Sequence, residues 1–266
     1  MQVVFIGAGR LASSLAPALT DAGHQVLQVF SRTLESAQAL AAQVGAAAVT
    51  DLSAVVSGAD AYIFSVTDTA LPTLAAELSA ALGDSSPQSV FLHTAGSIAM
   101  SIFASSALHY GVLYPMQTFS KERRVDMSCV PVFIEGCDEC SLSVAEQLAR
   151  SVSSQVLTLS SEGRRHLHLA AVFACNFANH CYQLSAEILS RYDIPFSVML
   201  PLIDETAAKV HELPPVQAQT GPAVRFDQGV LAAQQQLLSS NPRLAQIYEL
   251  MSQSIHESHQ NHIPHD

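Results

Sequence analysis

The first 160 residues alternate short apolar runs with amphipathic helical patterns. Residues 3–6 form an apolar run rich in β-branched and aromatic side chains, which is typical of a buried parallel strand. A helical pattern follows and ends near Ala22, and residues 25–30 and 34–44 repeat the order of strand and helix. Strands that alternate with helices in this way predict an α/β fold with a doubly wound, mostly parallel sheet.

The alternation continues to about Ser160 and then stops. From residue 161 to about 192 a single helical pattern runs without proline, and the remaining chain is helical and poor in strands. We therefore predict a sheet domain over residues 1–160 and an all-helical C-terminal domain over residues 161–266. The further strands expected in the first domain are residues 46–49, 61–66, 89–92, 111–113, 130–135 and 155–158, with a helix over residues 140–152.

The composition is that of a compact globular protein. Among 266 residues, 49% are apolar and 13% are charged, and 12 basic against 23 acidic side chains give a formal net charge of -11. No basic cluster exceeds two adjacent arginines, so nucleic acid and anionic membrane surfaces are poor candidate partners. Met1 leads into the first strand without a basic leader, no apolar run approaches membrane-spanning length, and the five cysteines are odd in number. Together these features predict a cytoplasmic protein with reduced thiols.

Gly7-Ala8-Gly9-Arg10-Leu11-Ala12 joins the first strand to the first helix. In this Gly-x-Gly-x-x-Ala order, the first glycine allows a tight turn, the second lets a pyrophosphate approach the backbone, and the alanine lets the helix pack closely on the strand. The phosphates would lie on the unpaired N–H groups at the start of the helix. We interpret the motif as a dinucleotide-binding turn of the Rossmann type, with a tight turn that holds no nucleotide as the alternative. The residues expected to contact the cofactor here are Gly7, Ala8, Gly9, Arg10 and Leu11.

The end of the second strand indicates which dinucleotide binds. An NAD site places an acidic residue here for the ribose 2′-OH, whereas an NADP site needs a cation and hydroxyls for the 2′-phosphate. The chain has Ser31-Arg32-Thr33 and no acid at this point. Arginine suits the role because its planar guanidinium can bind phosphate through two N–H groups. We therefore predict NADP as the cofactor, with a solvated Arg32 at the start of a helix as the alternative.

Polar residues follow three further strands, at the edge where a doubly wound sheet binds its ligand. Val66, Thr67 and Asp68 are expected near the cofactor, although Asp68 is more readily interpreted as the N-cap of the next helix. Thr94 is expected to contact the cofactor as well. The side chains expected around a nicotinamide and its substrate are His93 and Ser97 after one strand and Tyr114, Gln117 and Thr118 after the next.

The long helix over residues 161–192 carries further candidates. Asn176 and His180 lie one turn apart on one face, and His168 lies on nearly the same stripe two turns earlier. The first half of this helix is apolar almost all round. We therefore expect it to be buried between domains or between subunits.

A polar loop over residues 219–227 presents Arg225 and Asp227 two residues apart. Such a loop either caps a helix or reaches into a cleft. We favour the cleft, where Arg225 would hold an anionic group of a substrate. Elsewhere, Cys137 and Cys140 are spaced as C-x-x-C but lack a second cysteine pair, so we expect no metal site.

With these motifs in place, the chain resembles NADP oxidoreductases that join a Rossmann-like domain to a helical C-terminal domain of unknown function. It is similar more distantly to pyrroline-5-carboxylate reductase, prephenate dehydrogenase and the 6-phosphogluconate dehydrogenase superfamily. The resemblance implies a homodimer formed through the C-terminal helices, with the active site between the two domains. It rests on the glycine turn, His93-Thr94-Ala95-Gly96-Ser97, Tyr114-Pro115-Met116-Gln117-Thr118-Phe119, Ala171-Val172-Phe173-Ala174-Cys175-Asn176-Phe177 and Thr220-Gly221-Pro222.

The chain departs from one branch of these relatives at a catalytic position. The hydroxyacid dehydrogenases have a catalytic lysine one helical turn before an asparagine on the interdomain helix. If Asn176 is that asparagine, this chain has Val172 in place of the lysine. Ordinary β-hydroxyacid chemistry is therefore not expected.

Two functional hypotheses follow from these residues. The first is an NADP-dependent oxidoreductase that transfers hydride between NADPH and a small carbonyl or imine substrate. The second is a catalytically silent NADP-binding sensor or partner-binding protein, which the missing lysine favours. In the first hypothesis His93, His180 and Tyr114 are candidate proton donors, Ser97 and Asn176 orient the substrate, and Arg225 is an anion clamp.

Overall fold

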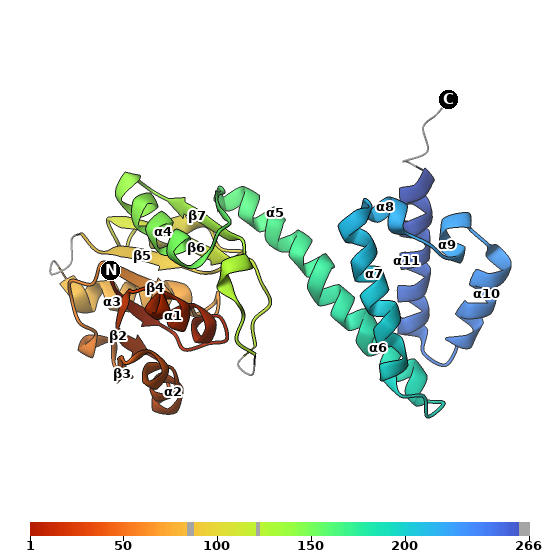
Figure 1. The fold of residues 1–266 in the computed structure, drawn as a ribbon, viewed down its shortest axis with the longest axis horizontal. Coiled ribbons are helices and arrows are strands. Elements are labelled where there is room, and N and C mark those ends of the chain that lie inside the picture. Colours follow the sequence, from red (N-terminus) through yellow and green to blue (C-terminus); the bar gives the residue numbers. More distant parts are fainter. Residues whose placement is uncertain (84–87, 121–122, 261–266) are drawn as a thin grey trace. The chain divides into compact units, whose positions relative to one another are not determined.

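The computed structural model describes residues 1–83, 88–120 and 123–260. The chain forms two compact units, Met1–His180 and Cys181–Asp266 (Figure 1). The first unit contains the sheet, and the second is helical throughout its described part. This confirms the predicted fold class. Within the described ranges, every helix is too short or too polar to cross a bilayer.

An eight-stranded sheet organises the first unit, in the order β3-β2-β1-β4-β5-β6-β7-β8. Neighbouring strands are parallel except β6 and β7, which are antiparallel. The chain moves outward from β1 in one direction through β2 and β3, and then returns to add β4 on the other side of β1. The carboxyl ends of β1 and β4 therefore form the switch point where doubly wound sheets bind ligands. The strands are β1 (Gln2–Ile6), β2 (Gln25–Phe30), β3 (Ala47–Val49), β4 (Ala61–Phe64), β5 (Val90–His93), β6 (His109–Pro115), β7 (Val132–Gly136) and β8 (Val156–Thr158).

Helices cover both faces of the sheet, because successive side chains of a strand point to opposite faces. Val3 and Phe5 of β1 belong to the core beneath α1 (Ala12–Asp21), α2 (Leu34–Val44) and α4 (Glu139–Val152). Val4 and Ile6 belong to the core beneath α3 (Leu71–Leu82) on the other face. Both faces of β1 are thus apolar, as its uninterrupted apolar run predicted.

The long helix predicted after Ser160 is present, but it is not a continuous α-helix. It consists of α5 (Ser161–Ala171), a π-helical segment (Val172–Phe177) and α6 (Ala178–Ser190). The predicted boundary at residue 160 lies between the last strand, β8, and the helix α5. The two compact units instead divide inside the helix, after His180. The boundary at residue 160 stays a prediction about functional domains.

The second unit is a small set of helices with little core of its own. Its helices are α7 (Leu200–Glu212), α8 (Pro215–Ala218), α9 (Pro222–Arg225), α10 (Gln228–Leu237) and α11 (Pro242–Gln260), and α9 and α10 pack against α11. Among its described residues only Ala223, Leu244 and Ser252 are buried. Many large apolar side chains are exposed instead, including Leu202 on α7 and Leu250 on α11.

Candidate functional site

The glycine turn has the backbone that the sequence predicted. Gly7 has a φ of +114°, and a Cβ at this position would lie 2.2 Å from the carbonyl oxygen of Ser65. Only glycine fits, because a side chain would collide with the backbone that follows β4. The backbone N–H of Gly7 also donates to the carbonyl oxygen of Phe30 at 2.8 Å. The turn is therefore held between β2 and the segment after β4.

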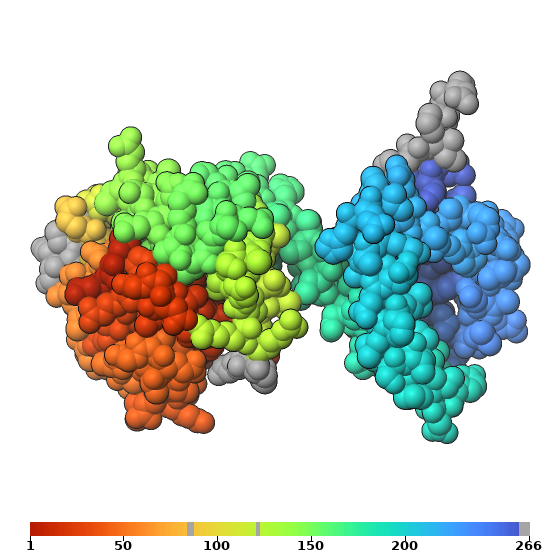
Figure 2. Space-filling view, viewed as in Figure 1, coloured from red at the N-terminus to blue at the C-terminus, as the bar shows by residue number. Residues whose placement is uncertain are grey.

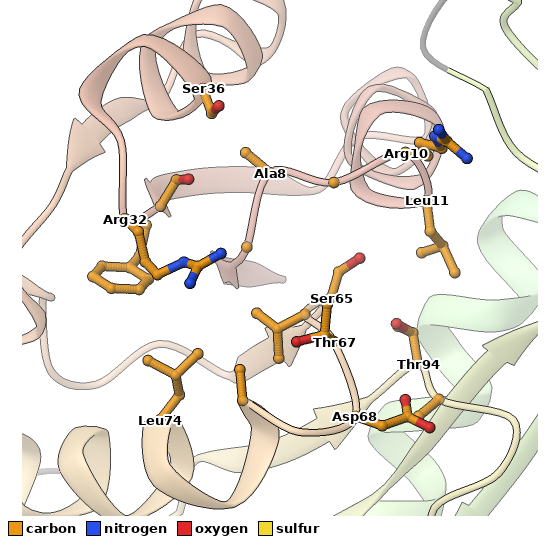
Figure 3. A pocket seen from close by; sticks show the side chains of 17 residues that line it. Ala8, Arg10, Leu11, Arg32, Ser36, Ser65, Thr67, Asp68, Leu74 and Thr94 are labelled. Carbon is orange, nitrogen blue, oxygen red and sulfur yellow. The ribbon is translucent and has the colours of Figure 1, made fainter.

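A cleft of about 480 Å³ opens at the switch point, above this turn (Figure 3). No side chain caps the start of α1. The N–H groups of Ser13 and Ser14 already donate to the carbonyl oxygens of Gly9 and Leu11, whereas those of Leu11 and Ala12 have no partner among the described residues and can bond a ligand oxygen. The cleft brings together eleven of the twelve residues predicted to contact the cofactor. They are Gly7, Ala8, Gly9, Arg10, Leu11, Ser31, Arg32, Val66, Thr67, Asp68 and Thr94.

One end of the cleft is cationic. The guanidinium of Arg32 points into it, and the hydroxyl of Ser36 lies across from it on the wall formed by the start of α2 (Figure 3). Ser36 was not predicted, although it lies only four residues after Arg32. Thr33 is the predicted residue that does not line the cleft, because its hydroxyl is turned toward α2 and donates to the Ser36 hydroxyl at 2.9 Å. A cation with nearby hydroxyls suits a 2′-phosphate.

Asp68 and Thr94 lie at the other end of the cleft (Figure 3). The interpretation of Asp68 as a helix cap is wrong. The N-cap position of α3 is Ala70, and no side chain caps this helix. The N–H groups of Ala70 and Leu71 both donate to the carbonyl oxygen of Thr67 and so form a turn before the helix. Because of this turn, α3 begins two residues later than a cap at Asp68 would require. Asp68 instead accepts a short hydrogen bond from the hydroxyl of Ser97.

A second cavity of about 530 Å³ lies between the end of β6 and the long helix, within the first unit. The segment that follows β6, which lies at the surface and is yellow-green in Figure 2, contributes Met116, Gln117 and Thr118 to its lining. Tyr114, Gln117, Thr118 and Asn176, all predicted from the sequence, line this cavity. The other lining residues are Met116, Leu167, His168, Ala170, Ala171, Ala174 and Cys175.

His168 is a further functional candidate, which the sequence analysis placed on the helical stripe of Asn176 without giving it a role. Its Nδ1 lies 3.1 Å from the hydroxyl oxygen of Tyr114, and the two rings pack edge to face. A Cβ on Gly96 would lie 2.5 Å from the same Nδ1, so glycine at this position makes room for the imidazole. The signal was available, because His168 lies on nearly the same helical stripe as Asn176.

The loop after β5 joins the two cavities. Thr94 and Ala95 line the first cavity, Gly96 abuts His168 in the second, and Ser97 bonds Asp68 in the first. The expectation that β5 and β6 end at the same edge of the sheet is confirmed by their parallel pairing. Ser97 thus contacts Asp68 after β4, and Gly96 lies against His168 on α5, which in turn contacts Tyr114 of β6.

Arg164, a residue of α5, is hydrogen-bonded to the loop after β5. The guanidinium is 1% exposed, and its Nη1 lies 2.5 Å from Oε2 of Glu135 on β7. Its Nε donates to the carbonyl oxygen of Ala95 at 3.2 Å, and its Nη2 donates to that of Ile98. A buried ion pair of this kind is compensated only when its remaining donors and acceptors are also bonded. Ser161 provides further hydrogen bonds to the carboxylate of this pair, since its N–H and its hydroxyl each donate to Glu135 at 2.7 Å.

His93 lies behind the loop and lines neither cavity. The side chain is fully buried, its Nδ1 accepts from the N–H of Ala95 at 3.2 Å, and its Nε2 has no partner among the described residues. Burial, and then the positive charge of Arg164, lowers the pKa of His93 to about 3. The ring is therefore neutral at pH 7, which disfavours it as a proton donor.

Two further predicted residues line neither cavity. His180 is exposed on α6, and Arg225 is exposed in the last turn of α9, in the second unit. Gly221 has a φ of +111°, which confirms the unusual backbone of this loop. Asp227 caps α10 by accepting from the N–H of Val230 at 3.2 Å. The capping alternative is therefore correct for Asp227.

Two family models match the chain. A model described as NADP oxidoreductase, coenzyme F420-dependent, matches residues 2–90, and a domain of unknown function, DUF2520, matches residues 130–255. The first covers the glycine turn and the second covers the long helix with most of the second unit. No curated protein matches the chain.

Solved structures extend this comparison. A Bacteroides fragilis protein provisionally described as an NADP oxidoreductase shares 48% sequence identity over 96% of this chain and 98% of its own, with a TM-score of 0.90. An imine reductase from Myxococcus stipitatus, solved with NADP+, is 16% identical over 98% of this chain and 95% of its own, with a TM-score of 0.69. A pyrroline-5-carboxylate reductase from Coxiella burnetii is 16% identical over 97% of both chains, with a TM-score of 0.60. The latter two share the fold.

Proposed function

The chain belongs to the NADP oxidoreductases, and from that premise we propose that it reduces a small carbonyl or imine substrate with NADPH. One observation carries the proposal: the loop over residues 94–97 contributes to the cleft at the switch point and abuts a second cavity lined by a tyrosine, a histidine and an asparagine. A nicotinamide at the inner end of the cleft would lie beside that loop. The second cavity is then the place for the substrate.

The residues of the cleft fit NADP. Gly7 keeps the turn narrow, the N–H groups of Leu11 and Ala12 remain for the pyrophosphate, and Arg32 with Ser31 and Ser36 suits the 2′-phosphate. Bound NADPH supplies a hydride to the substrate carbon. The protein itself has to orient the substrate and provide a proton to its oxygen or nitrogen.

The second cavity contains groups for both tasks. Tyr114 carries a hydroxyl proton, and burial raises the pKa of this phenol while the positive charge of Arg164 opposes that rise. Asn176 can bond a polar substrate group, and Ser97 is held by Asp68 at the junction with the cleft. We therefore place Tyr114 first among the proton donors predicted from the sequence. His93, His180 and Arg225 remain predictions without a place in either cavity.

A homodimer is the second part of the proposal. Exposed apolar side chains continue from the long helix into the second unit, where almost nothing is buried. Phe173 and Phe177 of the π-helical segment are 63% and 49% exposed and stack edge to face on each other. Exposed apolar side chains that pack on each other in this way are typical of association surfaces. A second copy of the chain is the partner we propose.

The test of the proposed function is NADPH oxidation, followed by absorbance, with a panel of small aldehydes, ketones and cyclic imines. We expect consumption with at least one carbonyl or imine and a strong preference for NADPH over NADH. Tyr114→Phe should lower kcat by about 10²-fold or more while NADPH still binds, because proton donation contributes on that scale. Tight NADPH binding without turnover of any compound would contradict the proposal and favour a silent NADP-binding protein.

A further inference from the structure

Tyr114 and His168 are paired inside the second cavity, and neighbouring groups enforce the pairing. Tyr114 is 8% exposed at the end of β6, and its hydroxyl oxygen lies 3.1 Å from Nδ1 of His168 on α5. Both residues line the cavity. A tyrosine that gives up its proton to a substrate needs a second group to return one, and histidine can carry a proton near neutral pH.

The pairing depends on an unusually close approach of the backbone. A Cβ on Gly96 would lie 2.5 Å from Nδ1, 2.7 Å from Cγ and 3.0 Å from Cβ of His168. Gly96 does not have a positive φ, so its backbone conformation does not itself require glycine. The imidazole is what requires it, because any larger residue at position 96 would push the ring away.

The helix that carries His168 is also held in place. Arg164 lies one turn before His168 and is bonded to Glu135, to the Ala95 carbonyl and to the Ile98 carbonyl. These bonds fix both the start of α5 and the loop that contains Gly96. The ring of His168 is thus confined between Gly96 and Tyr114.

We propose that Tyr114 and His168 form a two-residue proton relay, and that position 96 is glycine because the relay needs the space. The relay rests on the proposed reductase function. In the forward reaction the substrate carbon receives hydride from NADPH, and the Tyr114 O–H bond breaks as its proton moves to the substrate oxygen or nitrogen. The Nδ1–H bond of the His168 imidazolium breaks in turn, and its proton re-forms the Tyr114 hydroxyl. The imidazole is left neutral and takes up a proton from solvent.

The first experiment measures the pair directly, without turnover. The full-length protein is labelled with [13Cε1]histidine, and the His168 signal is assigned by its loss in His168→Gln. At one fixed pH, Tyr114→Phe should move this signal, because the hydroxyl partner is gone. Gly96→Ala should move it too, because the added methyl displaces the ring. Gly229→Ala is the matched control, since a Cβ there meets nothing closer than Asp227 Oδ1 at 3.7 Å, and it should leave the signal unchanged.

The second experiment measures turnover with the substrate found in the panel. Tyr114→Phe and His168→Gln should each lower kcat by about 10²-fold or more, and the double variant should be no slower than the slower single one, as for groups that act as a unit. NADPH binding should stay within about twofold in all variants, because neither residue lines the cofactor cleft.

The outcomes separate the two proposals. A His168 signal that Tyr114→Phe does not move, or a His168→Gln variant with wild-type kcat, overturns the relay and leaves the reductase function standing. Wild-type protein that turns over no compound overturns the reductase function, and the relay with it. If Gly96→Ala does not fold, the Tyr114 and His168 variants still decide the question.

Discussion

The guanidinium of Arg32 is the charged group that we expect to distinguish NADPH from NADH. It points into the cleft beside Ser31 and Ser36 (Figure 3). Arg32→Ala should weaken NADPH binding by about 10- to 100-fold, which corresponds to the roughly 1.5–3 kcal/mol of a charge-assisted hydrogen bond. NADH has no 2′-phosphate, so its affinity should hardly change. Titration of reduced-nicotinamide fluorescence measures both.

A matched arginine variant controls for the loss of charge alone. Arg150 is exposed on α4 and pairs with Glu146 four residues away, outside the cleft. Arg150→Ala should leave both affinities within about twofold of the wild type. If Arg32→Ala weakened the binding of NADPH and of NADH equally, Arg32 would support the structure of the cleft but would not bind the 2′-phosphate.

His93 gives the protein an acid-sensitive core. Its folded pKa is about 3, against 6.5 for the free group, so between these values the unfolded chain binds a proton that the folded chain does not. Stability is therefore unaffected by this group above pH 6.5 and falls as the pH drops below it, by up to about 1.4 kcal/mol per pH unit. Urea unfolding of wild type and His93→Gln from pH 7.5 to 4 measures the effect. The variant should show the shallower fall, and parallel curves would mean that His93 does not titrate in this way.

Residues at the switch point were predictable because their chemistry follows from the strand that precedes them. Gly7, Arg32 and Thr94 each lie within two residues of the end of a strand, and parallel strands bring their carboxyl ends to one edge. His93 was predicted to be a proton donor because it is the last residue of a strand at the same edge. The side chain of such a residue can point either into the core or into the cleft, and the sequence does not distinguish the two. Asp68 failed as a cap because it lies inside the turn that Thr67 and Ala70 close, two residues before the N-cap position of α3.

At the scale of elements, the strands of the sheet and the helices α2 and α4 were predicted to within about two residues at each end, whereas the short 3-10 helices such as Met100–Phe103 were not predicted. β2 and α2 match their predicted ranges, Gln25–Phe30 and Leu34–Val44. Apolar runs and amphipathic periodicity are strong where each element packs on a single sheet. The antiparallel direction of β7 relative to β6 was not predicted. An apolar run predicts a buried strand but does not indicate in which direction that strand runs in the sheet.

The π-helical segment could not be predicted either. The six residues Val172–Phe177 have no glycine or proline and read as ordinary helix. A π-segment changes the phase of the helix, and such segments are frequent at functional sites. Here it contributes Ala174, Cys175 and Asn176 to the second cavity. The predicted pairing of Asn176 with His180 assumed regular α-helical spacing, and only Asn176 lines the cavity.

At the scale of the whole molecule, the two units differ in how they bury apolar surface. The first has cores on both faces of its sheet, whereas the described part of the second buries only three residues. A helical unit without a core of its own is stabilised mainly by what it packs against. The sequence predicted that the long helix would be buried between domains or subunits. In the single chain, Leu169, Phe173 and Phe177 of this helix are all about half exposed or more.

A second copy of the chain would cover these side chains, and obligate dimers commonly bury about 2,000 Å² or more of largely apolar surface. We therefore expect sedimentation equilibrium at micromolar concentration to give twice the chain mass of 28.3 kDa. Phe173→Glu should shift the protein toward monomer and lower its melting temperature, because a charge would have to be buried without a partner. Leu108→Glu is the control, since Leu108 is 71% exposed in the first unit, and it should leave the mass unchanged. A wild-type protein that sediments as a stable 28.3 kDa monomer would show that the helical unit holds together without a partner.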